Sequence, residues 1–180
     1  MSTSRKTSDC VHKGRVFALY RDQVTLPNGV DTTLEVIRHP GAAAIVPLTA
    51  EGRVLLLRQY RYAVDDWIWE IPAGTLEEGE SPLACARREL AEETGFSAAQ
   101  WHPLGVITPL PAYSDEKIHL FRAEALLPAE SRLDVDEIGE VHDFAFEEAL
   151  AMIAAGTICD AKTISGLAMA GWQTSRAALS

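Results

Sequence analysis

The sequence predicts an α/β or α+β sandwich, in which a mixed sheet packs against a few helices. Short runs of alternating apolar and polar side chains, separated by turn signals, fill residues 14–72 and are typical of strands. Residues 81–95 place apolar side chains at helical spacing. Strand patterns then return, and two helical patterns end the chain. No internal repeat or long linker divides it.

The strands expected before residue 72 are mostly antiparallel, because tight turns such as Pro27-Asn28-Gly29 and Ala50-Glu51-Gly52 separate neighbouring runs. Residues 1–13 are polar, and we expect a flexible, frayed terminus there. The expected strands are residues 16–20, 24–26, 32–38, 42–48, 54–59 and 67–71.

The first helix carries signals at both ends. Ser81 is an N-cap residue, Pro82 suits the first helical position, and Gly95 suits the C-terminal cap. Strands are expected over 101–108 and 117–127, and helices over 147–155 and 161–177. At 180 residues the chain is expected to form one domain over 14–180, following the flexible 1–13.

Composition excludes several functional classes. The net charge of −10 argues against binding nucleic acid through a basic face. Three widely spaced cysteines, without a Cys/His metal pattern, argue against zinc and a disulfide framework, and we expect reduced thiols in the cytoplasm. The start lacks the apolar region of a signal peptide, and no apolar run approaches ~20 residues, so we expect no membrane association.

Six acidic residues lie between Gly74 and Phe96. Glu89, Glu92 and Glu93 occupy positions i, i+3 and i+4, so a helix places them on one face. Three like charges at this distance repel one another unless a cation lies between them, and oxygen ligands favour Mg²⁺ or Mn²⁺ over zinc. The alternative is an ordinary solvent-facing surface rich in glutamate.

The spacing around these residues matches a known pattern. Gly74, Glu80 and Arg88-Glu89-Leu90-x-Glu92-Glu93-x-Gly95-Phe96 match the Nudix box in full. The sequence therefore resembles the Nudix hydrolases, which use divalent metal to cleave a nucleoside diphosphate linked to another moiety. This resemblance implies an α/β/α sandwich with a mixed sheet and N-terminal antiparallel strands, with the box forming a loop–helix–loop.

The resemblance also implies roles for individual residues. Glu89 and Glu93 would bind metal, with Glu92 helping directly or through water, and the backbone carbonyl of Ala73 would add a contact. Mg²⁺ is the expected cofactor, with Mn²⁺ possible. A second group of residues would support the structure: Gly74, Glu80, Arg88 and Gly95.

Residues outside the box resemble the ADP-ribose pyrophosphatase subgroup. Pro111 follows Gly95 by sixteen residues, a subgroup marker, and the segment 109–116 resembles its catalytic loop. Leu110 and Ala112 depart from that loop, where serine and glycine are frequent, which bears on substrate preference. The segments 58–61, 69–74 and 156–163 also match.

The expected chemistry is hydrolysis of the pyrophosphate in ADP-ribose to AMP and ribose 5-phosphate, or in a related nucleoside diphosphate sugar. The catalytic candidates are Glu116 as general base, Glu92 of the box as the alternative, and Asp115 as secondary. Asp115 and Glu116 could also be solvated turn residues. Arg61 is expected to contact phosphate, and adenine could stack on Trp67, Tyr20 or Tyr60. The expected substrate-binding set is Arg58, Arg61, Trp67 and Pro111.

Assembly and competing functions remain open at this point. The resemblance implies a homodimer in which strands within 14–40 lie at the interface. A GDP-sugar or other nucleotide-sugar hydrolase is an alternative activity. A non-catalytic module of the same fold that binds ADP-ribose is an alternative class, although the box is intact and no basic extension is present.

Overall fold

The computed structural model describes residues 3–130 and 139–177 of the chain. The chain forms two compact units. We call residues 3–41 with Thr108–Lys117 the N-terminal unit. The core unit is Ala42–Ile107 together with the described residues from Ile118 onward.

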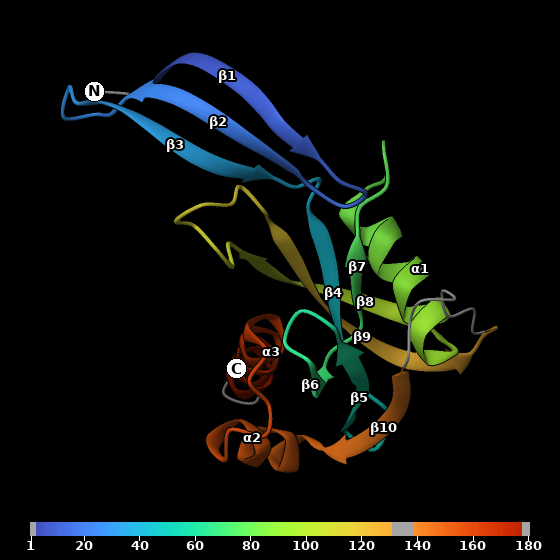
Figure 1. Ribbon diagram of the computed structural model, residues 1–180. Helices are drawn as coiled ribbons and strands as arrows, with labels where there is room; N and C mark the ends of the chain where they lie inside the picture. Colours follow the sequence, from blue (N-terminus) through green and yellow to red (C-terminus); the bar gives the residue numbers. More distant parts are fainter. Residues whose placement is uncertain (1–2, 131–138, 178–180) are drawn as a thin grey trace. The chain divides into compact units, whose positions relative to one another are not determined.

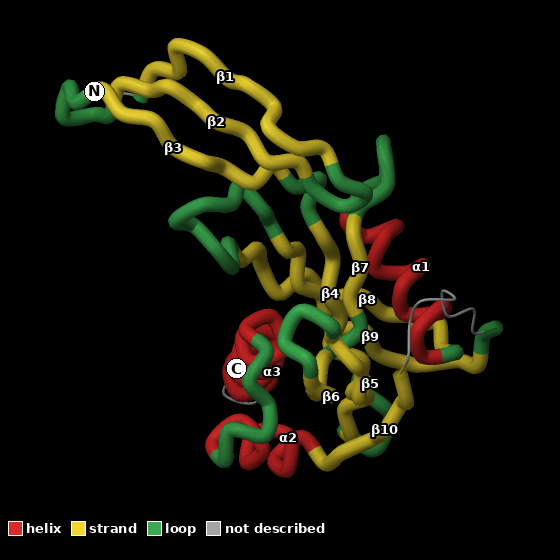
Figure 2. Tube along the Cα trace, viewed as in Figure 1, coloured by secondary structure: helices red, strands yellow, loops and turns green. Residues whose placement is uncertain are grey.

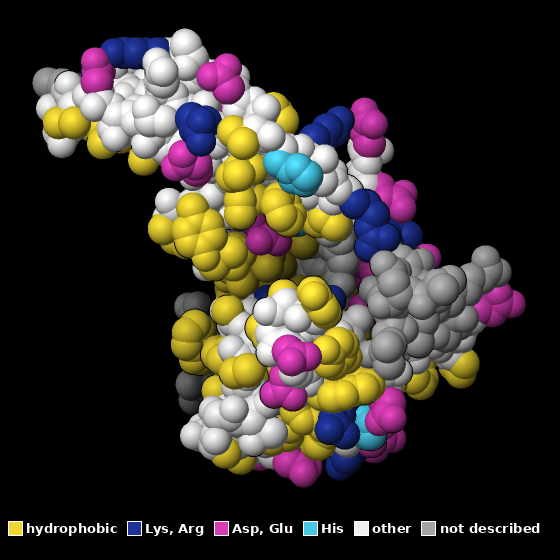
Figure 3. Space-filling model, viewed as in Figure 1, with side chains coloured by type: hydrophobic (Ala, Val, Ile, Leu, Met, Phe, Trp, Pro, Cys, Tyr) yellow, Lys and Arg dark blue, Asp and Glu magenta, His cyan; other side chains and the backbone are white. Residues whose placement is uncertain are grey.

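The N-terminal unit contains a three-stranded antiparallel sheet in the order β1-β2-β3 (Figure 1), so the antiparallel character expected here is present although the strand bounds differ. Its strands are β1 (Ser4–Lys13), β2 (Ala18–Thr25) and β3 (Asp31–Arg38). Gly29 closes the turn between β2 and β3 with φ 84°, a left-handed conformation that glycine adopts without strain. Hydrophobic side chains are exposed on this unit (Figure 3), among them Val11 of β1 and Leu34 of β3.

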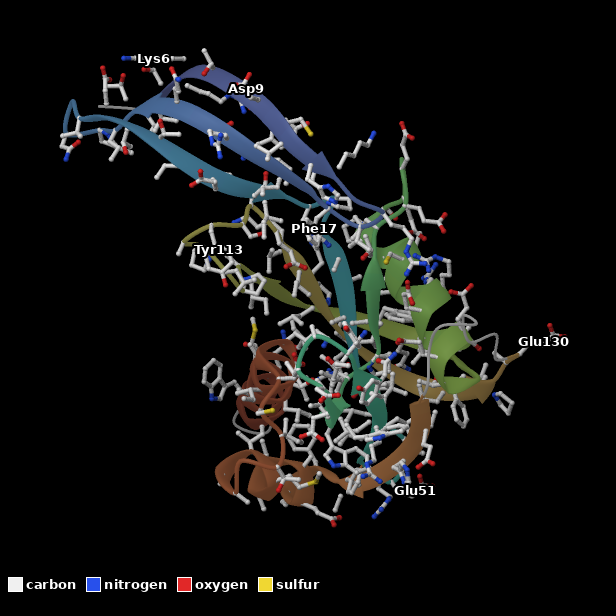
Figure 4. The ribbon with its side chains drawn as sticks, viewed as in Figure 1. Lys6, Asp9, Phe17, Glu51, Tyr113 and Glu130 are labelled. Atoms are coloured by element: carbon white, nitrogen blue, oxygen red, sulfur yellow. The ribbon has the colours of Figure 1, made fainter. Side chains whose placement is uncertain are left out.

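Two expectations for this unit differ from the structure. Ser4–Lys13 form β1 where a frayed segment was expected; Met1 and Ser2 lie outside the described residues. The strand is exposed throughout, with Lys6 and Asp9 projecting outward (Figure 4), so its sequence lacks the apolar alternation of a half-buried strand. The expected strands 16–20 and 24–26 are replaced by one continuous strand, β2 (Ala18–Thr25), because its polar centre also pairs with β3.

The core unit is built on a mixed sheet in the order β7-β4-β9-β8. The central strands β4 and β9 are parallel, and the outer pairs are antiparallel. Every residue of β4 is buried, so both faces of the sheet are covered. The strands are β4 (Ala42–Pro47), β7 (Ala73–Thr75), β8 (Phe96–Ile107) and β9 (Ile118–Pro128).

Helices cover the two faces of this sheet (Figures 1 and 2). Ala43 and Ile45 of β4 pack with Leu90 of α1 (Pro82–Thr94) in one hydrophobic cluster. Val46 packs on the other face, in the cluster that includes Leu167 of α3 (Ala161–Ala177). This arrangement confirms the predicted α/β/α sandwich with a mixed sheet.

A second antiparallel sheet, β10-β5-β6, and helix α2 complete the core unit. Their bounds are β5 (Arg53–Arg61), β6 (Asp66–Glu70), β10 (Gly139–Ala145) and α2 (Phe146–Ala154). The strand signals missed β10, because four of its residues in a row are exposed and the run is short. They also missed β7, which is only three residues long. Among the described residues no helix is long and apolar enough to cross a membrane.

Candidate active site

Helix α1 begins and ends at the residues that its capping signals predicted. The Ala84 N–H donates to Ser81 Oγ (3.2 Å), and Pro82 occupies the first turn. Gly95 ends the helix with φ 72°, and its N–H donates to the Ala91 carbonyl (2.9 Å). The caps and the buried apolar side chains together fix which face of α1 meets the sheet.

The acidic face of α1 lies against β7. Glu89 and Glu93 are only 9% and 3% exposed, whereas the Glu92 side chain is 39% exposed. The N–H of Ala73 donates to Glu93 Oε2 (2.8 Å). Glu89 and Glu93 are thus buried against β7 and do not form a solvent-facing surface. The structure brings Ala73, Glu89 and Glu93 together, as the sequence pattern implied.

Gly74 allows this close approach. A Cβ atom added to Gly74 would lie 1.7 Å from Glu89 Oε1 and 1.9 Å from Glu89 Cδ, well inside any permitted contact. The backbone of β7 can therefore reach the Glu89 carboxylate only if residue 74 has no side chain. This is a steric reason for glycine at the first position of the box, independent of the resemblance.

Arg88 is the cation of the cluster. Its Nε and Nη2 donate to the two carboxylate oxygens of Glu80 (3.1 and 3.0 Å), the bidentate geometry that suits a guanidinium. Its Nη1 donates to Glu89 Oε1 (2.6 Å) and Glu92 Oε2 (3.2 Å), and Nη2 also reaches the Thr75 carbonyl (3.2 Å). One guanidinium therefore joins the loop before α1, the helix and β7.

The ionisation of this pair follows from its contacts. Hydrogen bonds from Arg88 hold the pKa of Glu80 below its ordinary value, against the opposing effect of burial. The same bonds to Glu80, followed by the charge of Glu89, raise the pKa of Arg88. Glu80 and Arg88 are thus ionised at neutral pH, and their ion pair connects the loop to helix α1.

The donors of this cluster fit a hard divalent cation. The Arg88 guanidinium binds the carboxylates of Glu80, Glu89 and Glu92, and the Glu93 carboxylate accepts from the Ala73 N–H. Carboxylate and carbonyl oxygens are the ligands that Mg²⁺ and Mn²⁺ prefer. Within residues 3–130 and 139–177, no group of three or more His, Cys, Asp or Glu side chains has the geometry to hold a metal ion by itself.

Cys85 lies beside these oxygens but differs from them chemically. It is fully buried in α1, and its Sγ lies 3.5 Å from the Gly74 carbonyl. Burial, reinforced by the charges of Glu89 and Glu80, raises the pKa of the thiol to about 12. Cys85 is therefore a neutral thiol at physiological pH. A neutral thiol does not provide the thiolate that a metal would need.

A second buried cluster surrounds Glu70 at the end of β6. Glu70 is 3% exposed and its two oxygens are bonded to different cations. Arg61 donates to Oε2 through Nε (2.8 Å) and Nη2 (2.7 Å), and Lys162 Nζ donates to Oε1 (2.6 Å). Arg61, expected to contact phosphate, is thus paired with Glu70, while its side chain remains 40% exposed.

Arg58 and Trp67, two of the expected substrate-binding residues, lie together on β5 and β6. The Arg58 guanidinium carbon lies 5.6 Å from the Trp67 ring centroid, a cation–π distance. Tyr60 meets the same indole edge-on, with centroids 6.0 Å apart. Trp67 is 40% exposed, so its ring offers a stacking surface. Tyr20, the third candidate for stacking, lies on β2 in the N-terminal unit.

Asp115 fixes the loop Thr108–Lys117 to β3 within the N-terminal unit. Its Oδ2 accepts from Arg38 Nη1 (3.1 Å), and its Oδ1 accepts from the His39 N–H (3.0 Å). Arg38 also binds Asp22, which is 3% exposed, through Nη2 (2.5 Å). Pro111 and Tyr113 belong to the same loop, with Tyr113 at its outer side (Figure 4). Through these two hydrogen bonds, Asp115 holds the loop Thr108–Lys117 against the end of β3.

Glu116, the next residue, is less constrained by hydrogen bonds. Its side chain is 20% exposed, and its Oε1 lies 3.7 Å from His39 Nδ1. That nitrogen accepts from the Gly41 N–H (3.1 Å), which orients the imidazole. Its carboxylate can accept a proton without breaking the bonds that hold the loop. The two adjacent acids therefore differ in their contacts: both Asp115 oxygens accept hydrogen bonds, whereas Glu116 lies near His39 at 3.7 Å.

Sequence reasoning missed several residues that organise these clusters. Glu70, Asp160, Lys162 and Thr163 were noticed only as parts of matching segments, and Arg38 and His39 were not singled out. The contacts that join Arg38 to Asp22, Lys162 to Glu70 and Thr163 to Ile71 span 16, 92 and 92 residues, so no local spacing indicates them. A local signal was available for Asp160, since aspartate directly before a predicted helix is a favoured N-cap residue.

Comparisons with known proteins show which sequences and structures this chain resembles. The family model "NUDIX domain" matches residues 38–165. The chain is 40% identical over 155 residues to the ADP-ribose pyrophosphatase of Bacillus subtilis (strain 168), covering 85% of this chain and 84% of that protein. It is 41% identical over 156 residues to the methanol dehydrogenase activator of Bacillus methanolicus, covering 86% of this chain and 84% of that protein.

A solved structure described as an ADP compounds hydrolase superposes on this one with a TM-score of 0.84. The alignment covers 98% of this chain and 96% of that chain, at 22% sequence identity. At this identity the likeness speaks for the fold alone. The same arrangement of strands and helices is therefore adopted by a chain of quite different sequence.

Proposed function

The chain belongs to the NUDIX family and is a Nudix hydrolase, and from this premise we propose that it hydrolyses the pyrophosphate of ADP-ribose to AMP and ribose 5-phosphate. The observation that carries the proposal is the buried face of Glu89 and Glu93 against Ala73 and Gly74. The B. subtilis relative named for this substrate supports the choice of ADP-ribose.

A divalent metal, Mg²⁺ with Mn²⁺ as an alternative, is the proposed cofactor. Glu89, Glu93 and the Ala73 carbonyl would hold it, with Glu92 contributing directly or through water. When bound, it would neutralise the pyrophosphate and lower the pKa of a bound water. The chain's own contribution is to keep these oxygens close together, through Arg88 and the absence of a side chain at Gly74.

Glu116 is the proposed general base. It would accept the proton of the attacking water as the phosphorus–oxygen bond of the pyrophosphate breaks. Asp115 was the secondary candidate, but its two oxygens already accept from Arg38 and His39. We therefore give Asp115 the task of holding the loop. Glu92, the more exposed acid of the box, is the alternative base.

Substrate binding is proposed for the exposed side of β5 and β6 and for Pro111. Trp67 would stack on the adenine, with Arg58 beside the ring favouring the negative charge of the phosphates. Arg61 would reach phosphate only while sharing its guanidinium with Glu70. We accordingly expect Arg61 to contribute less to substrate affinity than Arg58.

We also propose a homodimer that uses strands within residues 14–40, with the two units acting as one domain over 14–180. Exposed Val16, Phe17 and Leu34 support such an interface, because apolar side chains in contact are removed from water. A cytoplasmic location is proposed because the three cysteines are free. No nucleic-acid or membrane partner is proposed.

A GDP-sugar or another nucleotide sugar is the second candidate substrate. Leu110 and Ala112 favour it, since they replace the residues frequent in the ADP-ribose loop. A panel of nucleotide sugars, tested with Mg²⁺ and Mn²⁺ in ¹⁸O-water, decides between them and reports which phosphorus is attacked. We expect AMP as the nucleotide product. GMP formation from a GDP-sugar at a higher kcat/KM, or ADP-ribose binding without turnover in either metal, would contradict the proposal.

A further inference from the structure

The segment from Glu70 to Gly74 carries the Ala73 carbonyl, one of the proposed metal ligands. Residues 71 and 72 lie between β6 and β7, outside the regular strand ladder. Pro72 has no N–H, and Ile71 is buried, so the Ile71 N–H must find a partner away from the ladder. That partner is Thr163 Oγ1 of helix α3, at 2.9 Å, and Thr163 is itself fully buried.

Asp160 determines the direction of this hydrogen bond. The Thr163 hydroxyl donates to Asp160 Oδ2 (2.5 Å), so an oxygen lone pair remains to accept from Ile71. The same carboxylate oxygen accepts from the Thr163 N–H (2.9 Å), which is the N-cap arrangement at the start of α3. The cap of α3 and the partner of Ile71 are therefore one hydrogen-bonded group.

Lys162 connects this group to the preceding residue of the segment. Its Nζ donates to Glu70 Oε1 (2.6 Å) and to Asp160 Oδ2 (3.1 Å), and its side chain is 12% exposed. Glu70 is also held by Arg61, so its position is fixed by two cations. The first two residues of the segment are thus bound to the first turn of α3.

The other end of the segment is held by strand β4 of the sheet and by helix α1. The Ile45 N–H of β4 donates to the Pro72 carbonyl (2.9 Å), and the Ala73 N–H donates to Glu93 Oε2 on α1 (2.8 Å). Helix α3 approaches closely because residue 166 is glycine: a Cβ there would lie 2.9 Å from Ile71 Cδ1. Consecutive residues of this short segment are therefore fixed by three separate elements.

We propose that Asp160, Lys162 and Thr163 are positioning residues that set the affinity of the metal site by fixing the Ile71–Ala73 backbone. The inference rests on the proposed function, in which the Ala73 carbonyl contacts the metal. Mg²⁺ demands near-ideal octahedral geometry, so a backbone oxygen that shifts with its peptide loses much of its value as a ligand. Outer partners of metal ligands typically alter affinity or activity about 10–100-fold.

The test is Mn²⁺ binding to the full chain without substrate, measured by electron paramagnetic resonance of the free ion. Thr163→Val keeps the shape of the side chain and removes the acceptor for Ile71, and we expect it to raise the Kd for Mn²⁺ about 10-fold. Thr163→Ser keeps the hydroxyl and should stay within about twofold of wild type on the same scale. Val54→Ala, a buried change on β5 at a residue paired with Phe144 of β10, controls for lost stability.

The outcomes separate this inference from the proposed function. If Glu93→Gln weakens Mn²⁺ binding but folded Thr163→Val does not, the inference is overturned and the metal assignment stands. If neither variant changes binding, the metal assignment itself fails. An equal loss in Val54→Ala would show that stability, and not position, sets the affinity. Should Thr163→Val fail to fold, Asp160→Asn takes its place. We expect the same rise in the Kd for Mn²⁺, about 10-fold, and an unchanged Kd in the folded variant would overturn the inference.

Discussion

Gly74 illustrates how one residue without a side chain shapes the acidic site. The backbone of β7 lies so close to Glu89 that a Cβ would overlap its carboxylate. The sequence pattern predicted a structural role for this glycine through a family resemblance alone. The physical reason for this glycine is visible only in the packing of α1 on β7, which brings together residues 15 positions apart in the sequence.

We therefore expect Gly74→Ala to displace Glu89 and to lower both Mn²⁺ affinity and ADP-ribose turnover by about 10-fold or more. Gly139→Ala is the matched control, since a Cβ there would meet only ordinary contacts, with the Arg58 carbonyl 3.7 Å away. Titration with Mn²⁺ and initial rates measure the effect. Equal binding and rates in the two variants would show that the close approach has no functional role.

Cys85 gives a second prediction for a single residue. Because burial and the nearby charges of Glu89 and Glu80 raise its pKa to about 12, the thiol stays protonated and unreactive near pH 8. Cys10 and Cys159 are exposed. Iodoacetamide should therefore modify these two in the folded protein and Cys85 only after unfolding, as read by peptide mass spectrometry. Modification of Cys85 in the folded protein at a comparable rate would contradict this environment.

At the level of elements, the loop before α1 depends on the ion pair between Glu80 and Arg88. Glu80 binds Arg88 through both oxygens and also accepts from the Glu77 N–H (3.1 Å), which closes the loop on itself. The pair connects the loop to the helix that carries the box acids. Its contribution to stability should follow the ionisation of Glu80.

The pKa of Glu80 is lowered in the folded state from its ordinary value of 4.5. The pair thus stabilises the fold fully above that ordinary value, and this contribution is lost as the pH falls through the lower folded-state pKa. Glu80→Gln should cost about 1–3 kcal/mol at pH 7, and the difference from wild type should shrink in acid.

Urea unfolding between pH 7 and pH 3 measures this difference. Glu78→Gln, in the same loop, serves as the control and should differ little from wild type at any pH. A difference between wild type and Glu80→Gln that stays constant down to pH 3 would mean that ionisation of Glu80 does not stabilise the loop.

The elements differ in how well their sequences predict them. Helix α1 was predicted with both ends, because its caps are local: Ser81, Pro82 and Gly95 act on neighbouring backbone groups. Helix α3 was also predicted with its bounds. Strands β1 and β10 were missed, since exposed strands lack an apolar face. Their pairing depends on partners elsewhere in the chain.

Some contacts of the candidate site were likewise predictable from the sequence, and others were not. Spacing on one helix predicted that Glu89, Glu92 and Glu93 share a face, and the full box pattern around them favoured a metal site over a solvent-facing surface. The contacts of Glu70 with Arg61 and Lys162 join residues from β5, β6 and α3, so only the fold reveals them. Asp115 and Glu116 are adjacent in sequence, and only the bonds from Arg38 and His39 separate their tasks.

For the whole molecule, the exposed apolar residues of the N-terminal sheet lead to a prediction about assembly. Light scattering should report twice the 19.6 kDa mass of one chain. Phe17→Asp, which puts a charge on an exposed apolar position, should shift the mass toward the monomer. Lys6→Gln, an exposed polar change on β1, is the control. A monomer mass for the wild-type chain would refute the proposed dimer.

The central claim is that the buried carboxylates of α1 support metal-dependent hydrolysis of ADP-ribose. The most direct measurement is the rate of AMP formation as Mg²⁺ is varied, for wild type, Glu93→Gln and the exposed-loop control Glu78→Gln. The account predicts that Glu93→Gln loses about 100-fold or more in rate even at saturating Mg²⁺, while Glu78→Gln matches wild type. A wild-type rate in Glu93→Gln at saturating Mg²⁺ would contradict it.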